Sequence, residues 1–273
     1  MDVTIWATLD EQAAAPRGSL LEHWFRTAID YFFCDQAKDD SRSYVLVTES
    51  ISGQREVRFK GVQNNWPALA DELRRQPFYA QAGFHEPAEG EGEWVDDIGR
   101  VGGQHEGRRG SHTGLTVALK AGAGIADPKG CTLFVDFLAA ALDDANPVFA
   151  RVDFLNFHDT TDLEAALRRS QRKSLREART HLRGYSWVTV VPSELATRLG
   201  GVSRLAETGV FHAVRELRGG GLLLQATETL AAYDGLAMRR VFQVLAPVLP
   251  SGIPGDDPAR PNLRIVFEDA SGV

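Results

Sequence analysis

The chain of 273 residues is 43% hydrophobic and 25% charged, which is the composition of a soluble globular protein that can bury a sizeable core. Its 37 acidic and 30 basic residues give a formal net charge of −7, which argues against nucleic acid as the main partner. Because no apolar run approaches the roughly 18 residues of a membrane helix and the N-terminus lacks a secretory signal, we expect a cytoplasmic protein without a membrane partner.

The first part of the chain alternates between strand and helix patterns. Apolar residues alternate with polar ones where a strand is predicted, and they recur at steps of one, three and four where a helix is predicted. In chain order, these elements are a strand at 3–9, a helix at 20–33, a hairpin of strands at 43–49 and 55–61 closed near Ser52 and Gly53, and a helix at 65–75.

A glycine-rich stretch at 76–114 then shows little apolar periodicity, so we predict a long loop there. This stretch holds a histidine cluster of His85, His105 and His112, with carboxylates beside two of them. Imidazole and carboxylate are ordinary zinc ligands, so the three histidines are candidate ligands of a metal site. Their spacing matches no metal motif, and the competing interpretation is a solvated loop that holds no metal or other cofactor.

The second part of the chain resumes the alternation of strands and helices. In chain order, the predicted elements are a strand at 115–120, a helix at 132–143, a strand at 149–157, a helix at 161–183, a strand at 187–191, a helix at 193–199, a hairpin of strands at 211–217 and 222–227, a helix from 236 that ends near Pro247, and a strand at 262–268.

The predicted helix at 161–183 is rich in arginine. Thr161 and Glu164 form a capping box at its start, and its leucines make one buried side on a helical wheel. Basic residues lie beside that side and form an arginine face, which can steer an acidic partner. The alternative is a solvated face whose bases pair with nearby carboxylates. The candidate partner-binding residues on the arginine face are Arg168, Arg172, Arg176 and Arg179.

At least two tight hairpins among these elements favour an α+β fold, with a mixed or largely antiparallel sheet packed by amphipathic helices. A Gly/Pro connection at 121–130 is the candidate boundary between an N-terminal half at 1–125 and a C-terminal half at 126–273. The two halves share a rhythm of strand, helix, hairpin and helix, which predicts two similar α+β halves, although no residue-level repeat connects them.

The sequence contains no motif that defines an activity. A nucleophile elbow, a phosphate loop, a dinucleotide fingerprint and a zinc spacing are all absent from it. Cys34 and Cys131 are too few for a disulfide framework, and both are predicted to be small core residues rather than reactive thiols. Chemical motifs alone therefore do not assign a function.

Several motifs in the second half follow one another in a recognisable order. A helix and a strand precede the arginine-rich helix, and then come GYSWVTVV at 184–191, LGG at 199–201, RELRGGG at 215–221, Tyr233 and LAP at 245–247. In these features the stretch 131–250 resembles the type VI immunity-protein family, within the wider group of immunity proteins that neutralise polymorphic toxins. Trp187, which lies in the first of these motifs, is predicted to be an ordinary core residue.

The resemblance implies a bacterial cytoplasmic protein, associated with type VI secretion, that binds a cognate toxin domain and blocks it without chemistry of its own. Such an inhibitor needs a stable scaffold and an exposed patch with charged or aromatic anchors. The arginine face and the 76–114 stretch are the candidate contact surfaces. Two alternatives stay open, namely a metal-dependent enzyme that uses His85, His105 and His112, and a structural or assembly protein.

Overall fold

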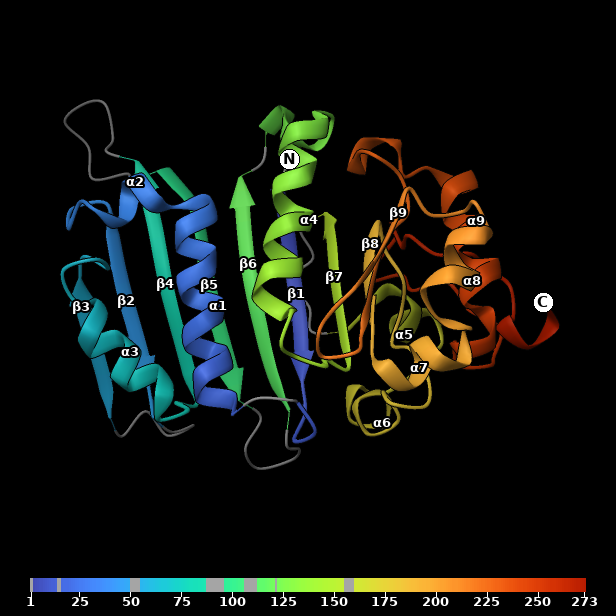
Figure 1. Cartoon of the computed structure of the whole chain (residues 1–273), viewed down its shortest axis with the longest axis horizontal. Coiled ribbons are helices and arrows are strands. Elements are labelled where there is room, and N and C mark those ends of the chain that lie inside the picture. Colours follow the sequence, from blue (N-terminus) through green and yellow to red (C-terminus); the bar gives the residue numbers. More distant parts are fainter. Residues whose placement is uncertain are drawn as a thin grey trace.

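A ten-stranded antiparallel sheet extends through the molecule, with its strands in the order β3-β2-β4-β5-β6-β1-β7-β8-β10-β9 (Figure 1). The structure is a computed structural model and describes residues 2–13, 16–49, 55–86, 96–105, 112–120, 122–154 and 160–273. The strands are β1 (Asp2–Leu9), β2 (Ser43–Thr48), β3 (Glu56–Lys60), β4 (Tyr79–Glu86), β5 (Asp96–His105), β6 (Thr113–Lys120), β7 (Phe149–Phe154), β8 (Val188–Val191), β9 (Ala213–Glu216) and β10 (Leu222–Gln225).

Helices pack on this sheet, which confirms the predicted α+β fold. The helices are α1 (Arg17–Phe32), α2 (Cys34–Ala37), α3 (Trp66–Arg74), α4 (Pro128–Leu142), α5 (Asp162–Ala166), α6 (Gln171–Arg176), α7 (Ser193–Arg198), α8 (Gly201–Glu207) and α9 (Gly235–Leu245), with short 3-10 turns at Gly122–Ile125, Leu230–Ala232, Ala246–Val248 and Ala270–Gly272. In Figure 1, α1, α3 and α4 lie in front of the N-terminal strands and cover one face of the sheet.

The N-terminal strand β1 lies inside the sheet rather than at its edge. It pairs with β6 on one side and with β7, from the second half of the chain, on the other. Above the sheet, Trp24 of α1 packs edge-on against Phe137 of α4, with ring centroids 4.9 Å apart. One sheet and one hydrophobic core thus extend through both 1–125 and 126–273, and a division between these halves stays a prediction.

The loop predicted at 76–114 is wrong for its described residues, because β4 and β5 form neighbouring strands there. Ala80, Ala82 and Phe84 of β4 are fully buried on the helix-covered side. The opposite side carries glycines such as Gly83, and glycine is unfavourable in strands and has no side chain to reveal an alternating pattern. Residues 87–95 and 106–111 of the predicted loop lie outside the described residues.

The single helix predicted at 161–183 is also wrong, because the chain forms two short helices, α5 and α6, followed by turns. The predicted capping box is present, since Thr161 N donates to Glu164 Oε2 at 2.7 Å and Glu164 N donates to Thr161 Oγ1 at 3.1 Å. Arg168 beyond α5 has a φ of 50°, and the Ser170 hydroxyl caps a new helix. The arginines therefore do not lie on one helical face.

Further predictions have mixed outcomes. The hairpin predicted at 211–217 and 222–227 is confirmed as the β9–β10 pair. The strand predicted at 262–268 is wrong, because that segment is irregular and its main chain bonds to side chains, as where Val266 N donates to Tyr185 Oη at 2.7 Å. Cys131 is buried as predicted, whereas Cys34 is exposed.

Two buried tyrosines beneath the C-terminal segment make a matched test of hydrogen bonding in the core. Tyr185 Oη accepts the bond from Val266 N, while Tyr233 Oη is buried without a hydrogen-bond partner among the described residues. Because an unsatisfied buried polar group costs about 1–3 kcal/mol, we expect Tyr233→Phe to raise the free energy of unfolding and Tyr185→Phe to lower it. Urea unfolding of both variants checks this, and a loss of stability in Tyr233→Phe would contradict it.

Because of the same two tyrosines, we expect the protein to lose stability at alkaline pH. Burial raises the pKa of both phenols above their ordinary value, so both stay protonated in the folded protein where an unfolded chain ionises, near about pH 10. Their contribution to stability is fully present below that pH and is lost as pH rises above it. We expect the urea midpoint to fall between pH 9 and 11, and to fall less in the Tyr185→Phe/Tyr233→Phe variant than in the wild type.

Candidate functional site

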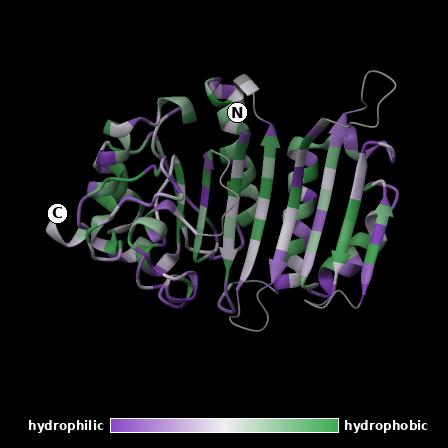
Figure 2. Ribbon diagram, turned by 180° about the vertical axis from the view of Figure 1, so that it is seen from behind, coloured by the Kyte–Doolittle hydropathy of each residue, from purple (hydrophilic) through white to green (hydrophobic). Residues whose placement is uncertain are grey.

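The face of the sheet opposite α1, α3 and α4 is left uncovered by helices over its N-terminal strands (Figure 2). The strand register places the outward-facing side chains in rows across this face. One row contains Gln81, Gly102, Thr116 and Trp6, and the next contains Gly83, Arg100, Ala118 and Thr4. Since the rows mix aromatic, amide and cationic side chains with glycine, the face offers contacts of several kinds to a ligand or partner.

Strand β1 marks the border of this uncovered face. On the far side of β1, Phe149 and Asp153 of β7 point the same way but are buried under the C-terminal half of the chain. Arg264 covers Asp153, with Nη1 and Oδ1 3.4 Å apart, and Arg183 Nη1 donates to Thr8 Oγ1 of β1 at 2.9 Å. The segments that hold Arg183 and Arg264 thus form a wall along one side of the uncovered face.

Three adjoining hollows follow β6 along the foot of this wall. The largest has a volume of about 210 Å³ and shares lining residues with a smaller hollow at each end. The hollow towards α6 shares Trp6, Gln104 and Gly114 with it, and the hollow at the opposite end shares Arg100 and Ala118. We call this line of hollows the sheet groove, and its principal lining residues are Thr4, Trp6, Arg100, Gln104, Thr116 and Ala118.

Glycines allow aromatic rings to lie close to the sheet around the groove. A Cβ atom on Gly114 would stand 3.0 Å from the ring of Trp6, and one on Gly83 would stand 2.3 Å from the ring of Tyr44. At Gly102, between these two positions, an added Cβ would meet the Thr116 hydroxyl at 2.7 Å. The glycines that obscured the strand pattern in the sequence therefore shape the floor of the groove.

Polar atoms in and beside the groove are partly unsatisfied. Thr4 is 7% exposed and its hydroxyl has no hydrogen-bond partner among the described residues, nor has the buried Nδ1 of His112. Beside them, Tyr79 Oη donates to Gln81 Oε1 at 2.5 Å, and Gln81 Nε2 donates to Tyr44 Oη at 3.1 Å. Because buried polar groups are nearly always hydrogen-bonded, the Thr4 hydroxyl marks a place where a bound group can accept or donate a bond.

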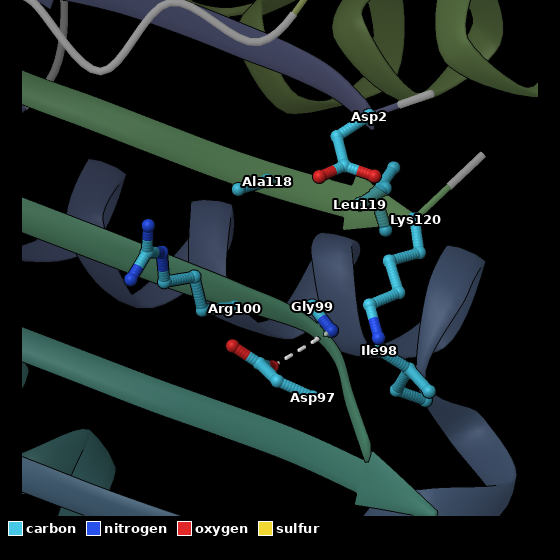
Figure 3. A pocket seen from close by; sticks show the side chains of 8 residues that line it. All are labelled: Asp2, Asp97, Ile98, Gly99, Arg100, Ala118, Leu119 and Lys120. Carbon is cyan, nitrogen blue, oxygen red and sulfur yellow. Dashed lines mark hydrogen bonds between the residues drawn. The ribbon is translucent and has the colours of Figure 1, made fainter.

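The end of the groove away from α6 is charged. Figure 3 shows the side chains of Asp2, Asp97, Arg100 and Lys120 around the hollow at this end. Asp97 Oδ1 accepts a bond from Gly99 N at 3.1 Å, which holds this carboxylate at the start of β5. Charges of both signs therefore meet at this end of the groove.

The other end of the groove meets the arginine-rich segment. Gln171 and Leu175 of α6 line the hollow at this end. Arg168, Arg172 and Arg176 are exposed around them and make no ion pair with a described residue. Three of the four predicted arginines thus lie on α6 or just before it, next to the residues that line this end of the sheet groove, and none of the three lines the hollow itself.

The fourth predicted arginine, Arg179, has other contacts. Its guanidinium donates to Asp10 Oδ1 at 2.7 Å and to Glu194 Oε2 at 3.0 Å, and its side chain is only 14% exposed. Burial alone would lower the pKa of this guanidinium, but the carboxylates of Asp10 and Glu194 outweigh burial and raise the pKa above its ordinary value. Arg179 therefore connects the residue after β1, α7 and the segment after α6, and it is not available to a partner in this arrangement.

The three candidate metal ligands do not come together. His85 of β4 pairs with Asp97 at the start of β5, whereas His105 ends β5. At about 3.3 Å per residue along a strand, roughly 25 Å separates the two histidines. His105 and His112 are closer to each other, since the His105 ring lies 3.3 Å from Oγ1 of Thr113, the residue that follows His112. Burial lowers the pKa of both imidazoles. The described residues hold no group of three or more His, Cys, Asp or Glu side chains arranged to bind a metal ion.

Sequence reasoning missed most of the groove. Tyr79, Gln81 and Gln104 lie within the stretch predicted to be a loop, and the pattern around Trp6 predicts only an opening strand. The sequence did contain a signal for these strands. Alternate residues at 79, 81 and 83, and at 100, 102 and 104, are polar, aromatic or glycine. Alanine, phenylalanine and valine stand between some of them, which is the alternation of a strand with one buried face.

Comparison with known proteins identifies the fold. No family model matches the chain, and no match was found among the curated proteins. Among solved structures, the Pseudomonas aeruginosa T6SS protein PA0821 superposes with a TM-score of 0.53 at 14% sequence identity, covering 97% of this chain and 78% of that protein. This likeness shows a shared fold over nearly the whole chain. Within the described residues, no helix has both the length and the apolar character needed to cross a bilayer.

Proposed function

We propose that the protein is a non-catalytic, type VI-associated immunity protein that binds a cognate toxin domain in the bacterial cytoplasm and neutralises it. The motifs at 184–191 and 215–221 support this proposal through their resemblance to immunity proteins. The fold shared with a protein described as a T6SS protein also supports it. Neither observation depends on the other, since one concerns short motifs and the other concerns the path of the whole chain.

The observation that carries the proposal is the sheet groove with its basic rim. Interface hot spots are enriched in Trp, Tyr and Arg, and they lie in pockets from which water is excluded. Trp6 and Tyr79 line the groove, and Arg172 and Arg176 lie exposed at its end without an ion pair to a described residue. A protein domain with an acidic, contoured surface is the partner that such a face suits best.

The basic rim gives a prediction about partner binding. We expect Arg172→Glu/Arg176→Glu to weaken binding of the toxin domain by about 10- to 100-fold, because like charges across an interface repel and steering is lost. The matched control is Arg204→Glu/Arg240→Glu, which makes the same change of charge at exposed residues of α8 and α9. Titration calorimetry at low and high salt measures both. Equal affinities for the two variants would exclude the rim from the interface.

The neutralising function is tested by growth. The tagged protein is used to capture partners from its native lysate, and each captured toxin-like domain is then expressed alone and together with this chain. We expect the domain alone to stop growth and co-expression to restore it, with a complex that survives purification. A captured domain that stays toxic in the presence of excess protein would refute neutralisation.

A further inference from the structure

We propose that the sheet groove binds an extended segment of the partner protein whose acidic residues lie at the α6 end of the groove. This inference rests on the proposed function, because it names the part of the toxin that the protein recognises. The ligand is a linear segment of protein rather than a small molecule or a broad folded surface.

The size of the hollows favours side chains of a partner over a small molecule. Their volumes are about 90, 210 and 20 Å³ in order along the groove. Sites for small molecules usually measure about 300–1,000 Å³ and enclose most of the ligand. The 210 and 90 Å³ hollows can each instead accept a side chain from a chain that lies along the groove, whereas the 20 Å³ hollow has room for about one water molecule.

The spacing of the groove matches that of an extended chain. Outward-facing residues of β6, such as Gly114, Thr116 and Ala118, repeat at every second position, which is about 6.7 Å. The side chains on one side of an extended segment repeat at the same distance. A segment that runs along β6 can therefore keep its alternate side chains in register with the outward-facing residues of β6 over the length of the strand.

Side chains rather than main-chain pairing must hold this segment. The main-chain groups of β5, β6 and β1 already bond to neighbouring strands, so a segment on the face of the sheet cannot join the ladder. The groove offers the amide of Gln104 and the unpartnered hydroxyl of Thr4 for the peptide groups of an extended chain. The ring of Trp6 supplies an apolar surface between them.

Charge sets which end of the groove takes the acidic residues. At the α6 end, the exposed cations Arg168, Arg172 and Arg176 have no ion-pair partner among the described residues. At the other end, Asp2 and Asp97 lie beside Arg100 and Lys120, so the two signs offset one another. Acidic side chains of a bound segment are therefore attracted to the α6 end and gain little at the other.

The test uses a phage-displayed library of linear twelve-residue peptides as the probe, so it does not require the toxin. We expect the full-length protein to enrich peptides rich in Asp and Glu, and we expect Gly102→Trp and Ala118→Trp to bind the enriched peptides at least tenfold more weakly in fluorescence anisotropy. An added Cβ at Gly102 meets the Thr116 hydroxyl at 2.7 Å and no main-chain atom closer than 3.7 Å, and Ala118→Trp fills the groove from a second position. Leu133→Trp, at a 48% exposed position on α4, is the control that should keep wild-type affinity.

The outcomes separate this inference from the proposed function. Failure to enrich any peptide, or enriched peptides that bind Gly102→Trp and Ala118→Trp as tightly as wild type, would overturn the groove as a peptide site. If both variants also restore growth as well as wild type does, neutralisation stands and the groove is not its interface. If the wild-type protein does not restore growth in the presence of any captured toxin domain, the proposed function is wrong. The peptide selection still shows, independently, whether the groove binds an acidic linear segment.

Discussion

Replacement of Arg183 by methionine is expected to lower the free energy of unfolding by about 3–5 kcal/mol, because it leaves a buried carboxylate without its counter-charge. Arg183 Nε donates to Glu164 Oε1 at 2.7 Å, and the two side chains are 2% and 1% exposed. The guanidinium also donates to Glu164 Oε2 at 3.1 Å and to Thr8 Oγ1 at 2.9 Å. One residue thus connects α5, β1 and the segment after α6.

Urea unfolding followed by circular dichroism measures this loss, and two further variants test its cause. In Arg183→Met/Glu164→Leu both charges are absent, so we expect it to be more stable than Arg183→Met alone. Arg218→Met removes a 70% exposed arginine that pairs with Asp143 and Asp144, and it should cost less than about 1 kcal/mol. Equal losses in Arg183→Met and Arg218→Met would show that burial of the pair has no effect on its contribution.

The fold was predictable where apolar periodicity was strong. The helix at 20–33 and the hairpins at 43–61 and 211–227 follow from local patterns, and each has its counterpart in the structure. β4 and β5 were not predictable in the same way, because glycines occupy positions on both faces of these strands and carry no signal of burial. The break in the helix near Arg168 was not predictable, because a helical wheel shows only where side chains face and gives no indication that one residue has a positive φ.

The candidate site was less predictable than the fold, because it depends on which strands are neighbours. Trp6, Tyr79 and Gln104 lie far apart in the sequence, and only the order β4-β5-β6-β1 brings them to one groove. The arginines of the 168–176 segment could be found from the sequence since they are local. Their position at the rim of that groove depends on long-range packing of α6 against the sheet.

Two tryptophans allow the scaffold and the site to be tested separately. Trp187 stands in the motif at 184–191, is fully buried and donates from Nε1 to Thr227 O at 2.8 Å. We expect Trp187→Ala to lower the free energy of unfolding by about 3–5 kcal/mol, because it opens a cavity in the core. Trp6 is only partly buried in the groove, so Trp6→Ala should cost no more than about 2 kcal/mol.

The effects on binding should fall in the opposite order. At a temperature where both variants remain folded, we expect Trp6→Ala to weaken binding of the toxin domain at least tenfold, since a truncated aromatic anchor costs more than about 1.4 kcal/mol in an interface. Trp187→Ala should bind within about threefold of wild type, because Trp187 lies away from any exposed surface. Calorimetric titration of both variants measures this contrast. If Trp187→Ala lost affinity while folded and Trp6→Ala did not, the interface would have to lie near the motif at 184–191 and not in the sheet groove.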